Sequence, residues 1–420
     1  MQTKKNRWLI ALAGVGIHIS IGSVYAWSVF TTPLQESIGW SLSQVSITFS
    51  IAILFLGLSA AFMGHFVEAK GPRKSGLVST IFFAAGMITA GFGIQLEMLW
   101  LLYVGYGVLG GIGLGIGYIT PVSTLVKWFP DRRGMATGLA IMGFGFAAMI
   151  ASPLMRTLIE SVGIPNTFFI LGAIYFTVML VSSLYLERPP EGYHPKGVVI
   201  DESAATVSKD LAQLTANEAI KTKRFYFMWL MLFINVTCGI AILAVASPMG
   251  VEIAGLSAGA AAFMVGIMGV FNGAGRLIWA SISDYIGRTN LYTLFFILQI
   301  GIFAVLPFTT NALLFQLLLF VMISCYGGGF SAIPAYIGDI FGTKQLGAIH
   351  GYILTAWAAA GLAGPFIVAR IYESTQSYAW SLYIFAGLFF VALVISIFIR
   401  ADIKKLKEKN ELDAVSASAK

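Results

Sequence analysis

An arginine lies directly after one of the least charged stretches of this 420-residue sequence. The segment from residue 258 to 275 contains no charged residue, and Arg276 follows it, eight residues before Asp284. At about 1.5 Å of rise per helical residue, this spacing puts Arg276 about 12 Å from the Asp284 end of its helix. A charge at that depth in apolar surroundings is costly unless a partner neutralises it.

The chemistry that Arg276 offers is the binding of a carboxylate. A guanidinium is planar, stays charged and matches a carboxylate with two parallel hydrogen bonds. No Asp or Glu falls within the apolar segments expected around it, so we expect its partner to be a bound anion. The alternative is that Arg276 bonds to backbone carbonyls at a helix break near Gly273 and Gly275. Asn272 lies one turn earlier on the same face, where it could orient the guanidinium, bind the anion or simply join two helices.

The composition places this arginine in a membrane. The chain is 58% hydrophobic and 11% charged, with a mean hydropathy of +0.84, whereas soluble domains carry about 25% charged residues. A bilayer core has a half-thickness of about 15 Å, so Arg276 is expected close to its middle. A central arginine costs from about 2.5–3.5 to about 10–17 kcal/mol, depending on how much water reaches it. We therefore expect Arg276 to face a hydrated cavity.

The fold class expected is an all-α membrane protein with two pseudo-symmetric bundles of six transmembrane helices. Residues 1–186 would form the N-terminal bundle, 187–224 a cytoplasmic linker, 225–400 the C-terminal bundle and 401–420 a cytoplasmic tail. The first apolar run has 23 residues, longer than the usual core of a signal peptide, and is expected to remain as a helix. The twelve expected spans run roughly over residues 8–30, 45–66, 76–96, 100–126, 135–158, 166–186, 225–248, 259–282, 291–308, 312–337, 349–370 and 378–399.

The basic residues set the expected orientation. The N-terminus, the linker, the tail and the loops on one side hold 23 of the 26 Lys and Arg. By the positive-inside rule, both termini and the linker are expected in the cytoplasm, with the chain in the cell (inner) membrane. The net charge of +7 then reflects orientation and lipid contact, and no nucleic-acid partner is expected. We also expect a monomer.

The two halves of the sequence repeat. GHFVEAKGPRK follows the second span and ASISDYIGR follows the eighth, and Glu68 aligns with Asp284 at an offset of 216 residues that also relates Gly71 to Gly287. Parallel repeats of this kind occur in transporters whose substrate site lies between the halves. No metal site, nucleophile–base pair or nucleotide loop is visible, so neither a metal, a cofactor nor an enzyme is expected. A membrane sensor is the remaining alternative class, and no extra soluble domain supports it.

GHFVEAKGPRK resembles the loop signature of the major facilitator superfamily, with Glu68 in the acidic position and a weaker copy at Asp284. The resemblance covers residues 6–400. Within it, one group of segments is similar to the bacterial oxalate/formate exchanger and monocarboxylate (lactate) transporter branch, and ISIGSVYAW (19–27) is also similar to the first helix of animal monocarboxylate transporters. The segments of that group are NRW (6–8), GSVYAW (22–27), GYITP (117–121), KWFPDRRGMATG (127–138) and NGAGR (272–276).

The resemblance implies a secondary carrier of small monocarboxylates, of the lactate or pyruvate kind, coupled to protons and working by alternating access. The alternative is an oxalate/formate-type anion exchanger. Two departures matter here. Trp357 stands where oxalate/formate exchangers have a lysine, and Asn272 and Val29 stand where animal monocarboxylate transporters have an acid and a lysine. One central cation and no second one favour a single carboxylate.

Helices 1, 4, 7 and 10 line the cavity in this superfamily, which implies that Tyr25, Tyr118 and Tyr326 lie near the substrate. Phe330 lies four residues after Tyr326 and so on the same helix face. Trp27 and Trp357 are further candidates for the walls of the site. In a chain with 14% aromatic residues, each of these side chains could instead be ordinary packing or interfacial belt.

Two further sets of residues have expected roles. His18, in the middle of the first span, is the candidate to hold a coupled proton; the alternative, favoured because no acid lies nearby, is a polar contact between helices. His65 and His350 are expected at cytoplasmic helix ends. A cytoplasmic latch between helices, which would hold one access state, is expected from Glu68, Arg73, Lys74, Asp284 and Arg288.

Overall fold

The computed structural model describes residues 5–193, 195 and 210–418, and this part of the chain is almost entirely helical. Residues 194 and 196–209 of the expected linker, and 419–420 of the expected tail, lie outside the described residues. The α-helices are α1 (Arg7–Gly22), α2 (Thr31–Ile38), α3 (Leu42–Lys70), α4 (Pro72–Gln95), α5 (Leu99–Leu102), α6 (Gly111–Trp128), α7 (Arg133–Val162), α8 (Ile164–Tyr185), α9 (Ala216–Ala219), α10 (Lys223–Ala254), α11 (Ala258–Ile286), α12 (Arg288–Val305), α13 (Ala312–Phe341), α14 (Leu346–Thr375) and α15 (Ala379–Ser418).

Three short segments with other helical geometries complete the chain: η1 (Ser23–Phe30) and η3 (Leu306–Phe308) are 3₁₀ helices, and η2 (Tyr103–Gly110) is a π-helix. η1 and η2 join α-helices into the continuous spans Arg7–Ile38 and Leu99–Trp128, and η3 extends α12 to give the span Arg288–Phe308. Each of the other spans is formed by one helix. The described residues thus contain twelve helices that are long and apolar enough to cross a membrane, which confirms the predicted number.

Tight turns join the helices of each repeat. Gly71, between α3 and α4, has φ 82°, and Gly287, between α11 and α12, has φ 84°. A side chain at such an angle would clash with its own backbone, which explains the glycine in both turns. The two positions are those that the sequence repeat aligns, so the repeat is also a repeat of backbone geometry.

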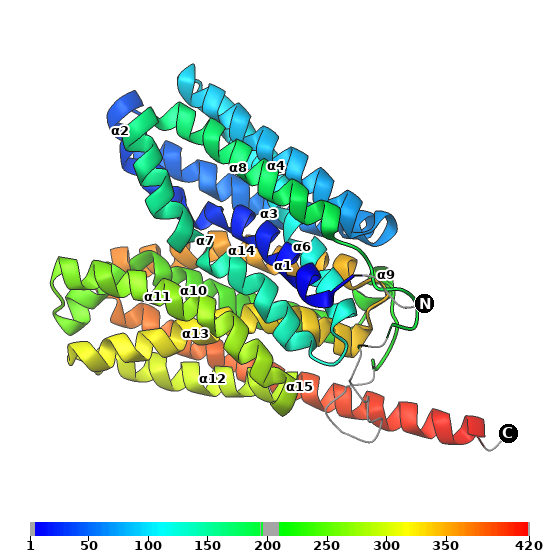
Figure 1. Cartoon of the computed structure of the whole chain (residues 1–420). Coiled ribbons are helices and arrows are strands. Elements are labelled where there is room, and N and C mark those ends of the chain that lie inside the picture. Colours follow the sequence, from blue (N-terminus) through cyan, green and yellow to red (C-terminus); the bar gives the residue numbers. More distant parts are fainter. Residues whose placement is uncertain (1–4, 194, 196–209, 419–420) are drawn as a thin grey trace.

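The helices form two groups, α1–α8 and α10–α15 (Figure 1). The groups converge at the end of the molecule where both termini lie, which we call the terminus side, and lean apart at the opposite end (Figure 1). Helix α3 packs on α14, and α7 packs on α11, across the boundary between the groups. Gly138 allows one of these approaches: a Cβ there would lie 2.6 Å from the carbonyl oxygen of Arg276. The groups therefore meet tightly beside Arg276.

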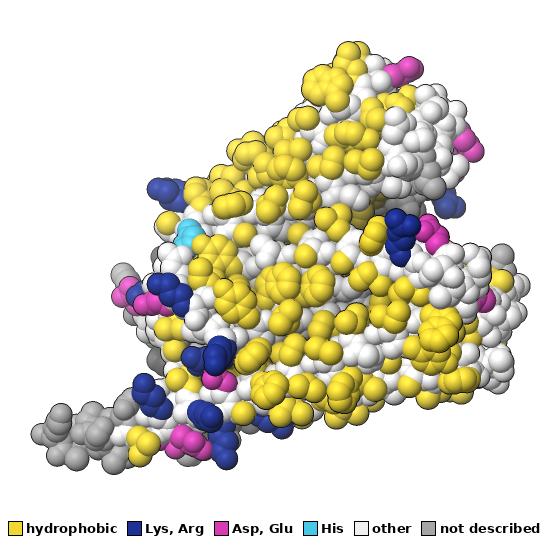
Figure 2. Space-filling model, turned by 180° about the vertical axis from the view of Figure 1, so that it is seen from behind, with side chains coloured by type: hydrophobic (Ala, Val, Ile, Leu, Met, Phe, Trp, Pro, Cys, Tyr) yellow, Lys and Arg dark blue, Asp and Glu magenta, His cyan; other side chains and the backbone are white. Residues whose placement is uncertain are grey.

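The surface agrees with a membrane setting. Figure 2 shows hydrophobic side chains over the flanks of both groups and most of the visible Lys and Arg side chains toward the terminus side. Helix α15 continues without a break through residue 400 and projects beyond the helix groups (Figure 1). The apolar flank is the part of the molecule that lipid tails would cover.

Candidate functional site

Arg276 is fully buried on α11, at the boundary between the two helix groups. Its Nε donates to Oδ1 of Asn272 (3.1 Å), and its Nη1 donates to the carbonyl oxygen of Ile141 on α7 (3.4 Å). Its Nη2 has no hydrogen-bond partner within the described residues. Helix α11 runs unbroken from Ala258 to Ile286, so no break in this helix supplies the carbonyl. The guanidinium is held in place by two contacts while one nitrogen stays free to bind.

Aromatic rings from five elements surround this guanidinium. The carbon Cζ of Arg276 lies 5.4 Å from the ring centre of Phe330 and 5.8 Å from that of Phe144, distances at which a cation is attracted to a ring face. Further ring contacts connect η1, α6, α7, α13 and α14 at centre distances of 4.8–6.4 Å. We call this set the aromatic cage; it consists of Tyr25, Tyr118, Phe144, Phe330 and Trp357.

The cage presents unpaired hydrogen-bonding groups. Nη2 of Arg276, Nε1 of Trp357 and the hydroxyls of Tyr25 and Tyr118 are buried without a partner in the described part of the chain. The first two atoms can only donate, and the hydroxyls can donate. An unpaired buried polar group costs about 1–3 kcal/mol, so groups of this kind in one cage are candidates to bind a ligand. The arrangement suits a ligand rich in acceptors and carrying negative charge.

Tyr25 and Tyr326 close the site from opposite groups. Tyr25 lies on η1, where the helix tightens to 3₁₀ geometry, a feature often found at functional hinges. Its hydroxyl lies beside Arg276 and Tyr326, without a hydrogen bond of normal geometry to either. Tyr326 is buried on α13, with its ring against Gly239 of α10. Both tyrosines therefore lie near the guanidinium.

The sequence model of the Major Facilitator Superfamily matches residues 11–330, which is more than half of the chain. This chain belongs to the Major Facilitator Superfamily. It is thus a multi-pass membrane transporter and not an enzyme, as predicted. The predicted all-α fold of this superfamily is confirmed as well.

Two sequence relatives and one solved structure illustrate the relationship. The chain is 27% identical over 380 residues to the oxalate:formate antiporter of Oxalobacter formigenes, covering 90% of this chain and 87% of that one. It is 22% identical over 458 residues to monocarboxylate transporter 14 of Mus musculus, covering 92% and 88%. The crystal structure of the superfamily transporter FucP, in an outward conformation, matches with a TM-score of 0.72 at 13% identity over 93% of this chain and 98% of that one. At that identity, FucP shows the fold alone.

Trp27 does not belong to the cage in this superfamily member. Its Nε1 donates to the carbonyl oxygen of Val45 (3.2 Å), and its ring lies 4.4 Å from that of Tyr106. Its other ring contacts, with Phe30 and Phe168, are also inside the first helix group. Two residues after Tyr25, the helix has turned this side chain to another face. We therefore remove Trp27 from the candidate site.

Two residues that sequence analysis did not place in the site lie in or beside the cage. Phe144 on α7 contacts Arg276, Tyr25, Tyr118 and Trp357. His350, expected at a helix end, is fully buried on α14 with its ring centre 5.9 Å from that of Tyr118. Neither ring nitrogen of His350 has a hydrogen-bond partner in the described chain. His350 and Tyr118 lie on different helices, so the packing of the helices, and not spacing in the sequence, brings the two rings together.

On the terminus side, two acids bridge the helix groups. Glu68 on α3 accepts from the backbone N–H of Gly347 at the start of α14 (2.7 Å). Asp284 on α11 accepts from the N–H groups of Gly134 and Met135 at the start of α7 (2.8 and 2.9 Å). Carboxylates at helix N-termini satisfy unpaired N–H groups and complement the positive end of the helix dipole. The two contacts are equivalent under the sequence repeat.

The basic partners of these acids differ from those expected. Arg288 bonds to Asp284 (2.6 Å), as expected, but Arg73 makes only an exposed contact with Glu187 (3.6 Å). Lys74 is exposed and has no ion pair in the described part of the protein. Lys127 instead pairs with Glu68 (2.8 Å). Neither Arg73 nor Lys74 forms an ion pair with Glu68 among the described residues, so they are not part of the bridge.

A further ion network crosses the same side. Arg133, at the start of α7, pairs with Asp210 after the gap in the described linker (2.6 Å) and with Asp339 on α13 (3.3 Å). Asp339 also pairs with Arg288 (3.3 Å). Sequence analysis missed Lys127 and Arg133, although both lie in the segment KWFPDRRGMATG that carries part of the resemblance.

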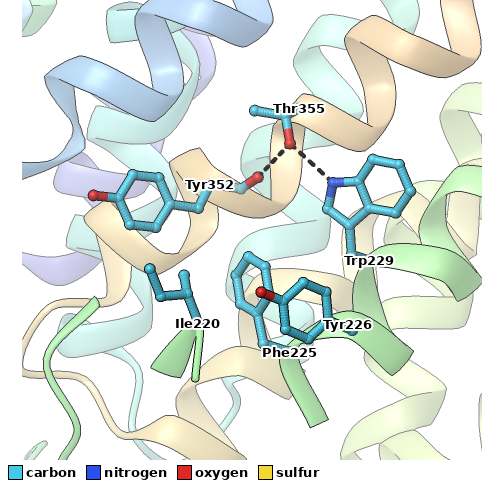
Figure 3. Close-up of a pocket in the computed structure, with 6 residues that line it drawn as sticks. All are labelled: Ile220, Phe225, Tyr226, Trp229, Tyr352 and Thr355. Carbon is cyan, nitrogen blue, oxygen red and sulfur yellow. Dashed lines mark hydrogen bonds between the residues drawn. The ribbon is translucent and has the colours of Figure 1, made fainter. Parts of the chain in front are cut away.

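A groove of about 450 Å³ lies away from this site, between α9, α10 and α14 (Figure 3). Its walls are apolar and aromatic, and they include Phe225, Tyr226 and Tyr352. The indole of Trp229 donates to Oγ1 of Thr355 (2.8 Å), which in turn donates to the carbonyl oxygen of Tyr352 (2.7 Å). No charged side chain is among the described residues that line it.

Proposed function

We propose that this transporter is a secondary carrier of small monocarboxylates of the lactate or pyruvate kind. The observation that carries the proposal is the unpaired Nη2 of the buried Arg276, inside a cage whose other unpaired donors are neutral. A carboxylate supplies two acceptor oxygens with several lone pairs, enough to take bonds from Arg276, Trp357 and a tyrosine hydroxyl together. The relative from Mus musculus is named a monocarboxylate transporter, which supports this substrate class.

The charge count favours one carboxylate over two. One carboxylate neutralises Arg276, whereas a dicarboxylate would bring a second negative charge into a site that offers it only neutral donors. Trp357, where the resemblance implies a lysine in oxalate/formate exchangers, is fully buried and adds no charge. An oxalate/formate-type exchanger remains the second candidate, because the Oxalobacter formigenes relative is named an oxalate:formate antiporter.

The orientation that we propose places the terminus side in the cytoplasm of a cell whose inner membrane holds the protein. The bias of 23 of 26 basic residues toward that side supports it. Under this orientation, the contacts of Glu68 and Asp284 close the cytoplasmic side, and substrate reaches Arg276 from outside. Rocking of residues 1–186 against 225–400, joined by the linker 187–224, then gives alternating access, and a monomer with its tail at 401–420 suffices.

The buried charge of Arg276 determines how anion transport is coupled to the movement of a second solute. An unloaded carrier must reorient with the Arg276 charge unneutralised in a dry site, so we propose that reorientation is slow until the anion binds. This gives either exchange of anions or cotransport of an anion with a proton. When one proton is carried with each monocarboxylate, a complete transport cycle moves no net charge across the membrane, and this is the mode that we favour.

Uptake into liposomes tests the function directly. Purified protein reconstituted at an inward-directed proton gradient is expected to accumulate radiolabelled lactate and to exchange it for unlabelled pyruvate. Oxalate is expected to compete at least about tenfold more weakly, or about 1.4 kcal/mol. Transport of oxalate in preference to lactate would support the second candidate, and no carboxylate transport by folded protein would contradict both.

The contacts of Glu68 and Asp284 across the terminus side give a prediction about the stability of the closed arrangement. Asp284→Asn replaces one carboxylate oxygen by an amide that cannot accept from the N-terminus of α7, so the closed arrangement should lose about 1–2 kcal/mol. We expect a longer distance to become populated between spin labels placed at the exposed positions Lys74 and Lys344, with substrate selectivity unchanged.

Glu373→Gln is the matched control for this experiment. Glu373 is also an acid in an ion pair, with Arg370 (3.3 Å), but both partners are exposed. It should leave the label distance unchanged, because exposed pairs contribute little. Equal distance distributions for Asp284→Asn and Glu373→Gln would show that the Asp284 bridge does not hold this state.

A further inference from the structure

His18 is a buried histidine with a backbone carbonyl oxygen beside each of its two ring nitrogens. It is fully buried on α1, between α6 and α7. Its Nδ1 lies 2.9 Å from the carbonyl oxygen of Ala140 on α7, and its Nε2 lies 3.1 Å from the carbonyl oxygen of Tyr118 on α6. Both ring nitrogens thus face an oxygen at hydrogen-bond distance.

The two oxygens constrain the protonation of the ring. A backbone carbonyl can only accept a hydrogen bond, and a neutral imidazole carries one N–H. In the neutral ring, the second nitrogen would point its lone pair at the lone pairs of a carbonyl oxygen in a buried site, where such contacts are costly. An imidazolium donates from both nitrogens and satisfies both oxygens.

We infer that His18 is the proton-binding site of this carrier, holding a proton between the carbonyls of Tyr118 and Ala140 while the terminus side is closed. This inference rests on the proposed function, because a coupled proton requires a transported anion. It reverses the sequence-based preference for a neutral helix contact. The geometry of the two carbonyls, which the sequence does not contain, is the reason.

The groups around the His18 ring determine how favourable its protonation is. The ring of Tyr118 on α6 stacks on it at 5.1 Å, and that of Phe144 on α7 lies edge-on at 6.2 Å. The charged or titratable groups within electrostatic reach from other elements are Arg276 on α11 and His350 on α14. No acid contacts the ring within the described residues. A protonated His18 is therefore paired by dipoles only, and Arg276 repels it.

Helix α7 links the proton to the anion. The carbonyl of Ala140 faces His18, and the next carbonyl, that of Ile141, accepts from Nη1 of Arg276. Because the two cations repel each other, an anion at Arg276 lowers the cost of protonating His18. By thermodynamic linkage, the proton must then tighten anion binding by the same factor. Consecutive residues of one turn of α7 therefore contact both the proposed proton site and the proposed anion site.

His350 is the contrasting case in the same region. Both of its ring nitrogens are unpaired in the described chain, so protonation would leave two buried donors without acceptors. We expect His350 to stay neutral throughout transport. The two histidines are equally buried, and they differ in whether carbonyl oxygens lie beside their ring nitrogens.

Transport separates this inference from the proposed function. In liposomes, His18→Gln is expected to lose lactate accumulation driven by a proton gradient while lactate–pyruvate counterflow persists, since exchange moves no net proton. His65→Gln, a histidine on the terminus side that bonds to the hydroxyl of Tyr352 (3.0 Å), is the control and should keep both activities. Retention of both activities by His18→Gln would overturn the inference but leave the carrier function intact. Absence of lactate transport by the unaltered protein would instead contradict the function.

Two measurements on folded protein in detergent do not depend on transport. Lactate is expected to bind about fivefold or more tightly at about pH 6 than at about pH 8, and His18→Gln should abolish this difference. In the unaltered protein labelled with ¹⁵N-histidine, the His18 signal, assigned by replacing the other three histidines in turn, should be that of an imidazolium when saturating lactate is bound at about pH 6. A neutral ring with lactate bound would overturn the inference even if His18→Gln fails to fold.

Discussion

Uptake of lactate by Arg276→Lys is expected to fall at least about tenfold, equivalent to about 1.4 kcal/mol. Lysine keeps the charge but loses the planar fork of donors. In the structure, that fork contacts Asn272 through Nε and Ile141 through Nη1, leaving Nη2 for the ligand. A single ammonium cannot hold both contacts and bind a carboxylate with two bonds, so affinity and positioning are lost together.

The measurement is the initial rate of counterflow in liposomes, normalised to the amount of folded protein. Arg370→Lys is the matched control, because Arg370 is exposed and its ion pair in the described part of the chain is with the exposed Glu373; it should transport at the unaltered rate. Asn272→Ala is expected to lie between the two, since it removes one contact that orients the guanidinium. Wild-type rates in Arg276→Lys would contradict the assignment of this arginine as a carboxylate clamp.

Trp357→Lys is expected to shift selectivity from lactate toward oxalate or malonate by at least about tenfold in competition. The indole is fully buried, 4.8 Å from Phe330 and 5.5 Å from Tyr118 between ring centres, and its Nε1 is unpaired in the described residues. An ammonium at this place adds a second cation near Arg276. A monocarboxylate leaves that charge unneutralised, whereas a dicarboxylate pairs both.

Trp357→Met separates the added charge from the lost ring. It also removes the indole but adds no cation, so it should weaken all substrates without favouring dicarboxylates. The measurement is inhibition of labelled lactate uptake by lactate, oxalate and malonate in each variant. If Trp357→Lys remains active and dicarboxylates still compete no better than in Trp357→Met, the charge count does not determine the substrate.

The number of spans and the position of Arg276 inside one of them could be predicted from the sequence alone. Backbone groups in a bilayer must be hydrogen-bonded within the segment, so a long apolar run has almost no alternative to a helix. Local relations within one helix were equally accessible: Asn272 lies one turn before Arg276, and the two side chains bond as the spacing predicts. The repeat of Glu68 and Asp284 also predicted two acids at equivalent places.

Which helix faces meet depends on how the helices pack, and the sequence does not indicate it. Trp27 and Tyr25 are two residues apart, yet one packs inside the first helix group and the other lies at Arg276. Arg73 follows the acid in sequence, whereas Lys127, from another helix, pairs with it in space. Apolar residues surround most of these helices, so hydrophobic periodicity does not specify their rotation. That rotation depends on how closely two helices approach.

The same reason applies to the cage and the proton site. A Cβ at Gly145 would lie 3.1 Å from Cδ of Arg276, so the absence of that side chain lets α7 bring Phe144 and the carbonyl of Ile141 to the guanidinium. The carbonyls that face His18 belong to two other helices. Every residue has a backbone carbonyl, so residue type does not indicate which ones will face the ring. The sequence gives the identity of each side chain, but a backbone oxygen becomes a hydrogen-bond partner only where helix packing directs it toward a ring. For His18, this packing decides between a neutral and a charged ring.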